Sequence, residues 1–164
     1  MSRLSYETAE TLVYDPVAAN RTATRSLLYT IGFRRIETVS TLSDMHDCMK
    51  RRPPDLVLCE AQGVEADLCR MIQDLRQGST GYNPFIVIIV TAWENSGALV
   101  SNVLNSGADD LILRPFSAST LGTRIISHVE RRKSFVIPTD YVWPDRNKDP
   151  KKRSNVQLFH PPNS

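Results

Sequence analysis

Residues 85–90 have the sequence FIVIIV, six hydrophobic side chains in a row with no polar residue among them. A strand with one face in water alternates apolar and polar residues, whereas a strand of a parallel sheet covered on both faces is apolar throughout. This run therefore predicts a strand of a buried parallel sheet.

The same unit recurs on both sides of this strand: a short apolar or β-branched run, a turn and a helical stretch. In the first unit, Leu27, Leu28 and Ile31 recur at helical spacing, and Gly32 supplies a helix stop. The predicted strands are residues 11–14, 36–39, 56–60, 85–90 and 111–113, and the predicted helices are residues 18–31, 42–51, 65–76, 96–106 and 118–132.

Five strand–helix units in about 120 residues predict an α/β domain, an open five-stranded parallel sheet with helices on both faces. An eight-stranded barrel would need roughly 200 residues or more. We expect an N-terminal extension at residues 1–10, the α/β domain at residues 11–132 and a proline-rich basic tail at residues 133–164.

Composition excludes several classes of protein. The chain has 164 residues, 41% of them hydrophobic and 23% charged, as in a soluble globular domain. It contains no apolar run near the roughly 20 residues that span a bilayer, and its polar start is unlike a signal peptide, so we expect no membrane partner and a cytoplasmic location. The net charge of +2 is too small to predict a nucleic-acid partner.

Cysteine and histidine show no ligand spacing, so we expect buried or solvent-facing roles for them and no cofactor. The tail differs from the body: from residue 131 onward it has eight Lys and Arg against three acidic residues. Its prolines discourage helix and its aromatic residues are costly to expose, which predicts an extended strap docked on its own domain or on a partner. The residues concerned are Cys48, Cys59, Cys69, His46, His128 and His160, and in the tail Phe135, Tyr141, Trp143 and the basic run at 151–153.

Polar side chains end or follow four of the predicted strands. In an open parallel sheet, the carboxyl ends of the strands meet at one edge, where ligand sites form. Carboxylates there could hold a divalent cation, while a hydroxyl and a guanidinium could cradle a phosphoryl group; alternatively, these are ordinary loop residues. They are Asp15-Pro16, Glu60, Thr91-Ala92 and Arg114-Pro115-Phe116. Asp109 and Asp110 precede the fifth strand at its other end and are predicted to form a solvated turn.

These residues give the chain a resemblance to the receiver domains of two-component response regulators. The resemblance runs from about residue 10 to residue 132, and its most specific part is Gly107-Ala-Asp-Asp-Leu-Ile-Leu-Arg-Pro-Phe116. It implies a flavodoxin-like, doubly wound (βα)5 fold. It also implies a cis peptide bond at Arg114-Pro115, which an X-Pro bond allows at low cost.

The sequence departs from the family at the site itself. The family binds Mg²⁺ through two acidic residues after the first strand and an aspartate ending the third, which a histidine kinase phosphorylates. Here Asp15 falls on the first acidic position, but Pro16, which has no side-chain oxygen, falls on the second. Glu60 takes the phosphoacceptor position with one extra methylene, which would misplace it for in-line attack. Any metal would have to rely on Asp15 and Glu60.

Three further positions complete the comparison with the family. Arg114 stands where a lysine usually contacts the phosphoryl group, Thr91 keeps the hydroxyl of the switch residue, and Leu111 replaces an aromatic residue that often reports the switch. We expect Glu60 to reach Arg114 and Thr91, either mimicking part of the charge of a phosphoaspartate or making an ordinary ion pair.

Three functions follow from this interpretation. The first is a non-enzymatic pseudo-receiver that binds protein partners, a histidine kinase or another signalling protein, and that dimerises through its fourth and fifth units. The second is a conventional phosphoaccepting single-domain response regulator. The third is an unrelated small enzyme, which the lack of a G-x-G-x-x-G loop or a nucleophile elbow counts against.

Overall fold

The computed structural model describes residues 6–78, 86–129, 135–137, 143–144 and 157–159. Its main body is a five-stranded sheet in the order β2-β1-β3-β4-β5, with every neighbouring pair parallel. The predicted α/β fold with a five-stranded parallel sheet is confirmed. The strands are β1 (Glu10–Tyr14), β2 (Arg35–Val39), β3 (Leu56–Glu60), β4 (Val87–Ala92) and β5 (Asp110–Leu113).

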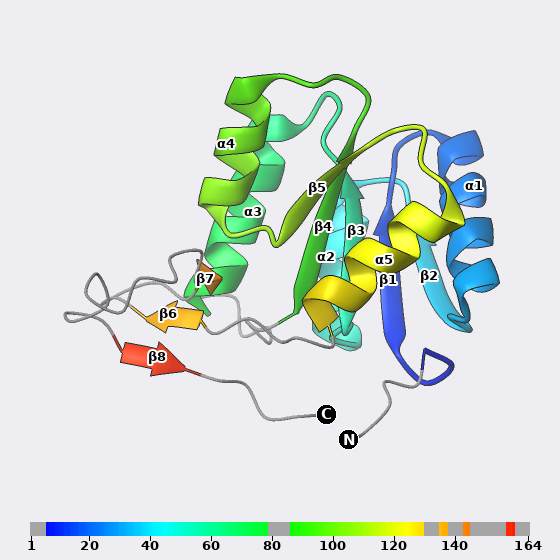
Figure 1. The fold of residues 1–164 in the computed structure, drawn as a ribbon. Helices are drawn as coiled ribbons and strands as arrows, with labels where there is room; N and C mark the ends of the chain where they lie inside the picture. The colour runs from blue at the N-terminus through cyan, green and yellow to red at the C-terminus, as the bar shows by residue number, and fades with distance from the viewer. Residues whose placement is uncertain (1–5, 79–85, 130–134, 138–142, 145–156, 160–164) are drawn as a thin grey trace.

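Helices cover both faces of this sheet, so the body has three layers (Figure 1). One apolar cluster joins the sheet to α2, α3 and α4, through residues such as Met45, Ile72 and Val103. The other joins it to α1 and α5, through Leu28 and Leu121. The helices are α1 (Ala18–Ile31), α2 (Leu42–Arg51), α3 (Glu65–Gln77), α4 (Gly97–Ser106) and α5 (Ala118–Val129).

The helix and strand ends follow the local signals in the sequence. The predicted bounds of α1, α2 and β3 are those observed, and α1 is capped by Gly32, whose φ of 130° suits glycine. The fourth strand was predicted to end at residue 90 but continues through Thr91 and Ala92. Both neighbouring strands extend far enough to pair with it there, since Thr91 lies opposite Glu60 of β3 and Ile112 of β5. Phe85 and residues 130–132 lie outside the described residues.

The predicted solvated turn at Asp109 and Asp110 is wrong. Asp109 is only 5% exposed and accepts hydrogen bonds from the Arg76 guanidinium (2.9 Å) and from the backbone N–H of Ile88 (2.8 Å). Asp110 is the first residue of β5, and its carboxylate accepts from Arg124. These partners lie on other elements, α3, β4 and α5, so the local pattern could not reveal them.

Part of the tail forms a second, antiparallel sheet in the order β7-β6-β8, where β6 is Phe135–Ile137, β7 is Trp143–Pro144 and β8 is Gln157–Phe159. These strands agree with the predicted extended conformation, whereas docking of the tail stays a prediction. His160 and the basic run at 151–153 lie outside the described residues.

The remaining sequence predictions concern thiols and membrane spans. Cys48 and Cys59 are buried and Cys69 is half-buried, each as a free thiol, which fits their predicted packing role. No helix in the described part of the chain is both long and apolar enough to cross a membrane.

Candidate functional site

The site centres on the carboxylate of Glu60, the last residue of β3, which is 1% exposed. Its Oε2 accepts a hydrogen bond from the Thr91 hydroxyl (2.6 Å) and another from Nε of Arg114 (2.9 Å). Within the part of the chain that the structure describes, its Oε1 accepts a single long hydrogen bond, from the backbone N–H of Gln62 (3.4 Å). Thr91 lies directly opposite Glu60 in the ladder, so the sheet register itself brings these two side chains together.

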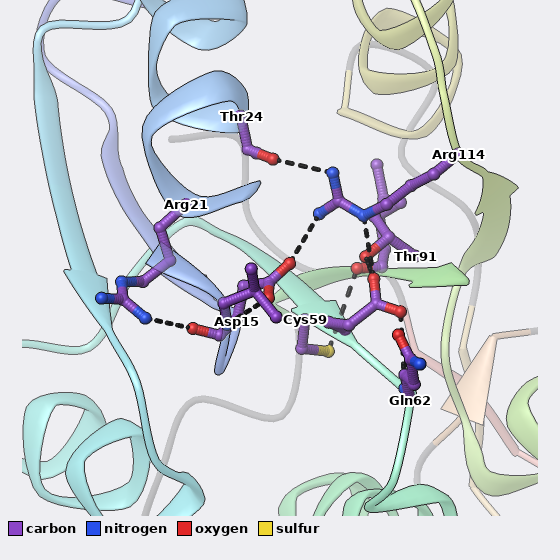
Figure 2. A network of polar contacts seen from close by, with 10 residues as sticks. Asp15, Arg21, Thr24, Cys59, Gln62, Thr91 and Arg114 are labelled. Carbon is purple, nitrogen blue, oxygen red and sulfur yellow. Dashed lines mark hydrogen bonds and ion pairs between the residues drawn. The ribbon is translucent and has the colours of Figure 1, made fainter. Parts of the chain in front are cut away.

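Arg114 follows β5 and uses all three guanidinium nitrogens, as Figure 2 shows for several of its partners. Nε donates to Glu60, Nη2 to Oδ2 of Asp15 (3.1 Å) and Nη1 to the Thr24 hydroxyl (3.2 Å). The side chain is 7% exposed, and its guanidinium carbon lies 5.1 Å from the centre of the Phe116 ring. The planar, permanently charged group thus ties together three separate parts of the chain.

Asp15, directly after β1, is fully buried, and both of its carboxylate oxygens are engaged. Oδ2 accepts from Arg114, and Oδ1 accepts from the backbone N–H of Val17 (2.8 Å). The Arg21 guanidinium donates to the backbone carbonyl of Asp15 (2.8 Å), which further holds this loop (Figure 2). Pro16, between them, is exposed and offers no side-chain oxygen.

The structure therefore brings together Asp15, Glu60, Thr91 and Arg114, as the sequence predicted, and makes the expected contacts of Glu60 with Thr91 and Arg114. The peptide bond at Arg114-Pro115 is cis, as predicted, and Pro115 itself is exposed. Leu111 is half-buried and packs against the cluster under α3 and α4 rather than lining the network.

Sequence reasoning missed Thr24 and Arg21, because neither lies at the end of a strand. Thr24 is fully buried in the middle of α1, one turn before Leu28 on the same face. A polar residue in line with the apolar positions of a helix was the available signal. A buried hydroxyl needs a partner, and the structure supplies Arg114.

The neighbouring groups that could act as nucleophiles stay protonated. Burial, helped by the Glu60 carboxylate, strongly raises the pKa of the Cys59 thiol. Burial, with Asp15 close by, also raises the pKa of Tyr14. Neither thiolate nor phenolate is therefore available at neutral pH, and the reactive chemistry of the site falls to its carboxylates.

The residues present do not fit a magnesium ion. Mg²⁺ requires oxygen ligands in near-octahedral geometry, and proteins usually supply one or two carboxylates. Three of the four carboxylate oxygens of Asp15 and Glu60 already accept short hydrogen bonds, two of them from a guanidinium. Within the described ranges, no three His, Cys, Asp or Glu residues are grouped so that they could hold a metal.

A groove of about 530 Å³ opens beside Glu60, between the loops that follow β3 and β4. Glu60 and Gln62 line it on one side, and Trp93 and Glu94 on the other. The Trp93 side chain is 46% exposed, so an apolar surface adjoins the polar network where a partner could approach.

Comparison with known proteins gives a consistent answer. The sequence profile described as response regulator receiver domain matches residues 11–126. Among solved structures, the signal receiver domain of a DNA-binding response regulator from Colwellia psychrerythraea is 20% identical with a TM-score of 0.65, and 74% of this chain covers 98% of it.

Two further structures show the same fold. A CheY-like receiver domain protein from Methanospirillum hungatei is 18% identical with a TM-score of 0.64, covering 75% of this chain and 94% of its own. An orphan response regulator of H. pylori is 20% identical with a TM-score of 0.61, covering 74% and 96%. A search of the curated proteins found no match.

Proposed function

The chain belongs to the response regulator receiver domain family, and we propose that it serves two-component signalling as a pseudo-receiver that is not phosphorylated. The observation that supports this most is the state of Glu60 at the phosphoacceptor position. One of its carboxylate oxygens accepts hydrogen bonds from both Thr91 and Arg114, the two groups that a phosphoryl group would otherwise engage.

This arrangement opposes phosphotransfer on two grounds. In-line attack needs a carboxylate oxygen with a free lone pair at a well-defined position. Oε2 of Glu60 is already committed to a hydroxyl and a guanidinium, and the longer side chain places it against them. Arg114 also pairs with the Asp15 carboxylate. Its positive charge, which phosphoryl transfer would need for the incoming group, is therefore already neutralised by side chains of the same domain.

A domain held in this way signals by contact with other proteins, such as a histidine kinase or another signalling protein. Its fourth and fifth units present a groove of about 490 Å³ between α4, β5 and α5. Val100, Leu104 and Leu111 give this groove an apolar lining, while Asp110 and Arg124 lie at its side. An apolar patch with a charged rim suits a protein partner, including a second copy of the chain.

One observation favours the alternative function, a conventional phosphoaccepting regulator. Among the described residues, Oε1 of Glu60 makes a single hydrogen bond, the 3.4 Å contact with Gln62, and Glu60 lines the groove beside Trp93. A phosphoryl donor entering that groove would approach Glu60, whose Oε1 carries the weaker hydrogen bond.

Intact-mass spectrometry after incubation with acetyl phosphate and Mg²⁺ separates the two functions. The positive control is a variant with Pro16→Asp, Glu60→Asp and Arg114→Lys, which restores the family's residues. We expect a phosphoryl adduct on this variant and none on the wild type. An adduct on the wild type that disappears in Glu60→Gln would establish the conventional regulator instead.

Sedimentation velocity adds a second readout. If the wild type signals without phosphorylation, its sedimentation coefficient is the same with and without acetyl phosphate. A shift on adding acetyl phosphate that Glu60→Gln abolishes would contradict the proposal.

A further inference from the structure

We propose that the Arg114 guanidinium is the resident cation of this site, standing where a divalent metal would otherwise lie, so that the wild-type chain excludes Mg²⁺. The inference concerns the same residues as the proposed function but tests a separate property of them. A chain could refuse the phosphoryl group and still bind metal.

The first step is the need for a positive charge. Asp15 and Glu60 are 0% and 1% exposed, and Arg114 joins their carboxylates, one from the residue after β1 and one from the last residue of β3. Burying two carboxylates without a counter-charge is costly, and proteins meet that cost with a paired cation or a metal. Here one guanidinium contacts both, at 3.1 Å and 2.9 Å.

The second step is that this cation is fixed. The third guanidinium nitrogen donates to the buried Thr24 hydroxyl, so rotation of the group away from the carboxylates would break three hydrogen bonds together. A lysine in this place could swing its single ammonium aside. Arginine has a planar fork and keeps its charge at any pH that the fold survives.

The third step is that a metal cannot share the space. A magnesium ion must approach carboxylate oxygens to about 2.1 Å, and one oxygen of each carboxylate, Oδ2 of Asp15 and Oε2 of Glu60, already accepts a hydrogen bond from Arg114. A dication at that place would also repel the guanidinium. Metal and guanidinium are therefore mutually exclusive.

The converse makes the inference testable. Without the guanidinium, two buried carboxylates converge on one space, and a hydrated divalent cation becomes the available counter-charge. Arg114→Met should therefore gain an affinity for Mg²⁺ that the wild type lacks. Arg25→Met is a matched control, because Arg25 is an exposed arginine on α1.

The experiment is thermal unfolding with and without millimolar Mg²⁺ at constant ionic strength, together with electron paramagnetic resonance of Mn²⁺ as a direct binding probe. We expect no change in Tm and no bound Mn²⁺ for the wild type or Arg25→Met. Arg114→Met should start with a lower Tm and recover several degrees on adding Mg²⁺, because a ligand of the folded state stabilises it. Arg114→Lys, whose ammonium can move aside, should show a smaller gain and is the readout if Arg114→Met does not fold.

Two results would overturn the inference. One is a rise in the wild-type Tm with Mg²⁺ accompanied by bound Mn²⁺. The other is a folded Arg114→Met or Arg114→Lys that stays as indifferent to both metals as the wild type. Metal binding by a wild type that takes no phosphoryl group would defeat this inference alone and leave the proposed function standing.

Discussion

The sheet has a carboxyl edge, where its strands end, and an amino edge, where they begin. A buried arginine stabilises each of them, and the two arginines make different kinds of contact. At the carboxyl edge, the acceptors of Arg114 in the described part of the chain are all side chains, from β3, α1 and the loop after β1. At the amino edge, the fully buried Arg76 donates to two backbone carbonyls, of Gly107 (2.9 Å) and Ile86 (2.8 Å), and to the carboxylate of Asp109 (2.9 Å).

The difference in acceptors suggests different roles: Arg76 is a structural clamp, whereas Arg114 belongs to the candidate functional site. Backbone carbonyls are present whatever the residue type, so Arg76 fixes the path of the chain where α3, β4 and the turn after α4 meet. The partners of Arg114 are side chains whose identity could change without moving the backbone. A contact built from replaceable side chains can change its chemistry while the fold stays the same.

The largest expected effect is that of Arg76→Met. It leaves the Asp109 carboxylate buried without its guanidinium and removes the hydrogen bonds to Gly107 and Ile86, so we expect a loss of about 3–5 kcal/mol in the free energy of unfolding. Urea denaturation measures it. Arg70→Met, an exposed position on the same helix, should change the free energy by less than about 0.5 kcal/mol. An equal loss of unfolding free energy in Arg76→Met and Arg70→Met would contradict the structural role of Arg76.

Gly107→Ala tests the same edge through the backbone. Gly107 has a φ of +117°, and an added Cβ would lie 2.6 Å from Cγ of Arg76. We expect a loss of about 1–3 kcal/mol, from backbone strain and overpacking together. Gly97→Ala is the control, because a Cβ built there meets no atom of the described residues within 4 Å outside its chain neighbours and its own helix backbone, and helix propensity favours alanine. A neutral Gly107→Ala would show that Arg76 can move aside.

Thr24→Val tests the carboxyl edge. It removes one of the three acceptors of Arg114 but keeps the shape of the side chain and leaves both ion pairs, so we expect a loss of about 1 kcal/mol. A double-mutant cycle with Arg114→Met should find the two effects non-additive. Strict additivity would mean that Thr24 does not position the guanidinium.

The smallest expected effect concerns the Asp110 carboxylate, which pairs with the partly exposed Arg124. Burial alone would raise the pKa of Asp110, but hydrogen bonds from His128 and Arg124 outweigh burial and hold its pKa below the ordinary value of 3.8. The ionised carboxylate therefore contributes stability that is present above about pH 4 and is lost as the pH falls through the lowered pKa.

Unfolding free energies measured from pH 7 down to pH 3 check this prediction. The wild type should lose slightly more stability on acidification than Asp110→Asn. Because Arg124 is 47% exposed, the difference should shrink with added salt. Asp47→Asn, at an exposed position on α2, is the control. If the free energy of unfolding falls equally steeply with pH in Asp110→Asn and the wild type, the ionised Asp110 carboxylate does not contribute to stability.

The candidate site could be predicted only where it depends on strand ends. Asp15, Glu60, Thr91 and Arg114 each lie at the carboxyl end of a strand, and parallel pairing alone requires these ends to share an edge. Thr24 and Arg21 joined the site through the position of α1 against that edge, which depends on the packing of Leu28 and its neighbours rather than on any local pattern.

By itself, the sequence determined the order and type of the elements and the residues at the strand ends, because hydrophobic period, glycine stops and proline act over a few neighbouring residues. It also determined that Pro16 offers no ligand and that Glu60 is longer than aspartate. The contact of Glu60 with Arg114 could be expected from the sequence, but the other buried charge pairs became visible only in the folded chain. The pairings of Arg114 with Asp15 and of Arg76 with Asp109 join residues that the sequence places far apart and that only the assembled sheet and its helices bring within hydrogen-bonding distance.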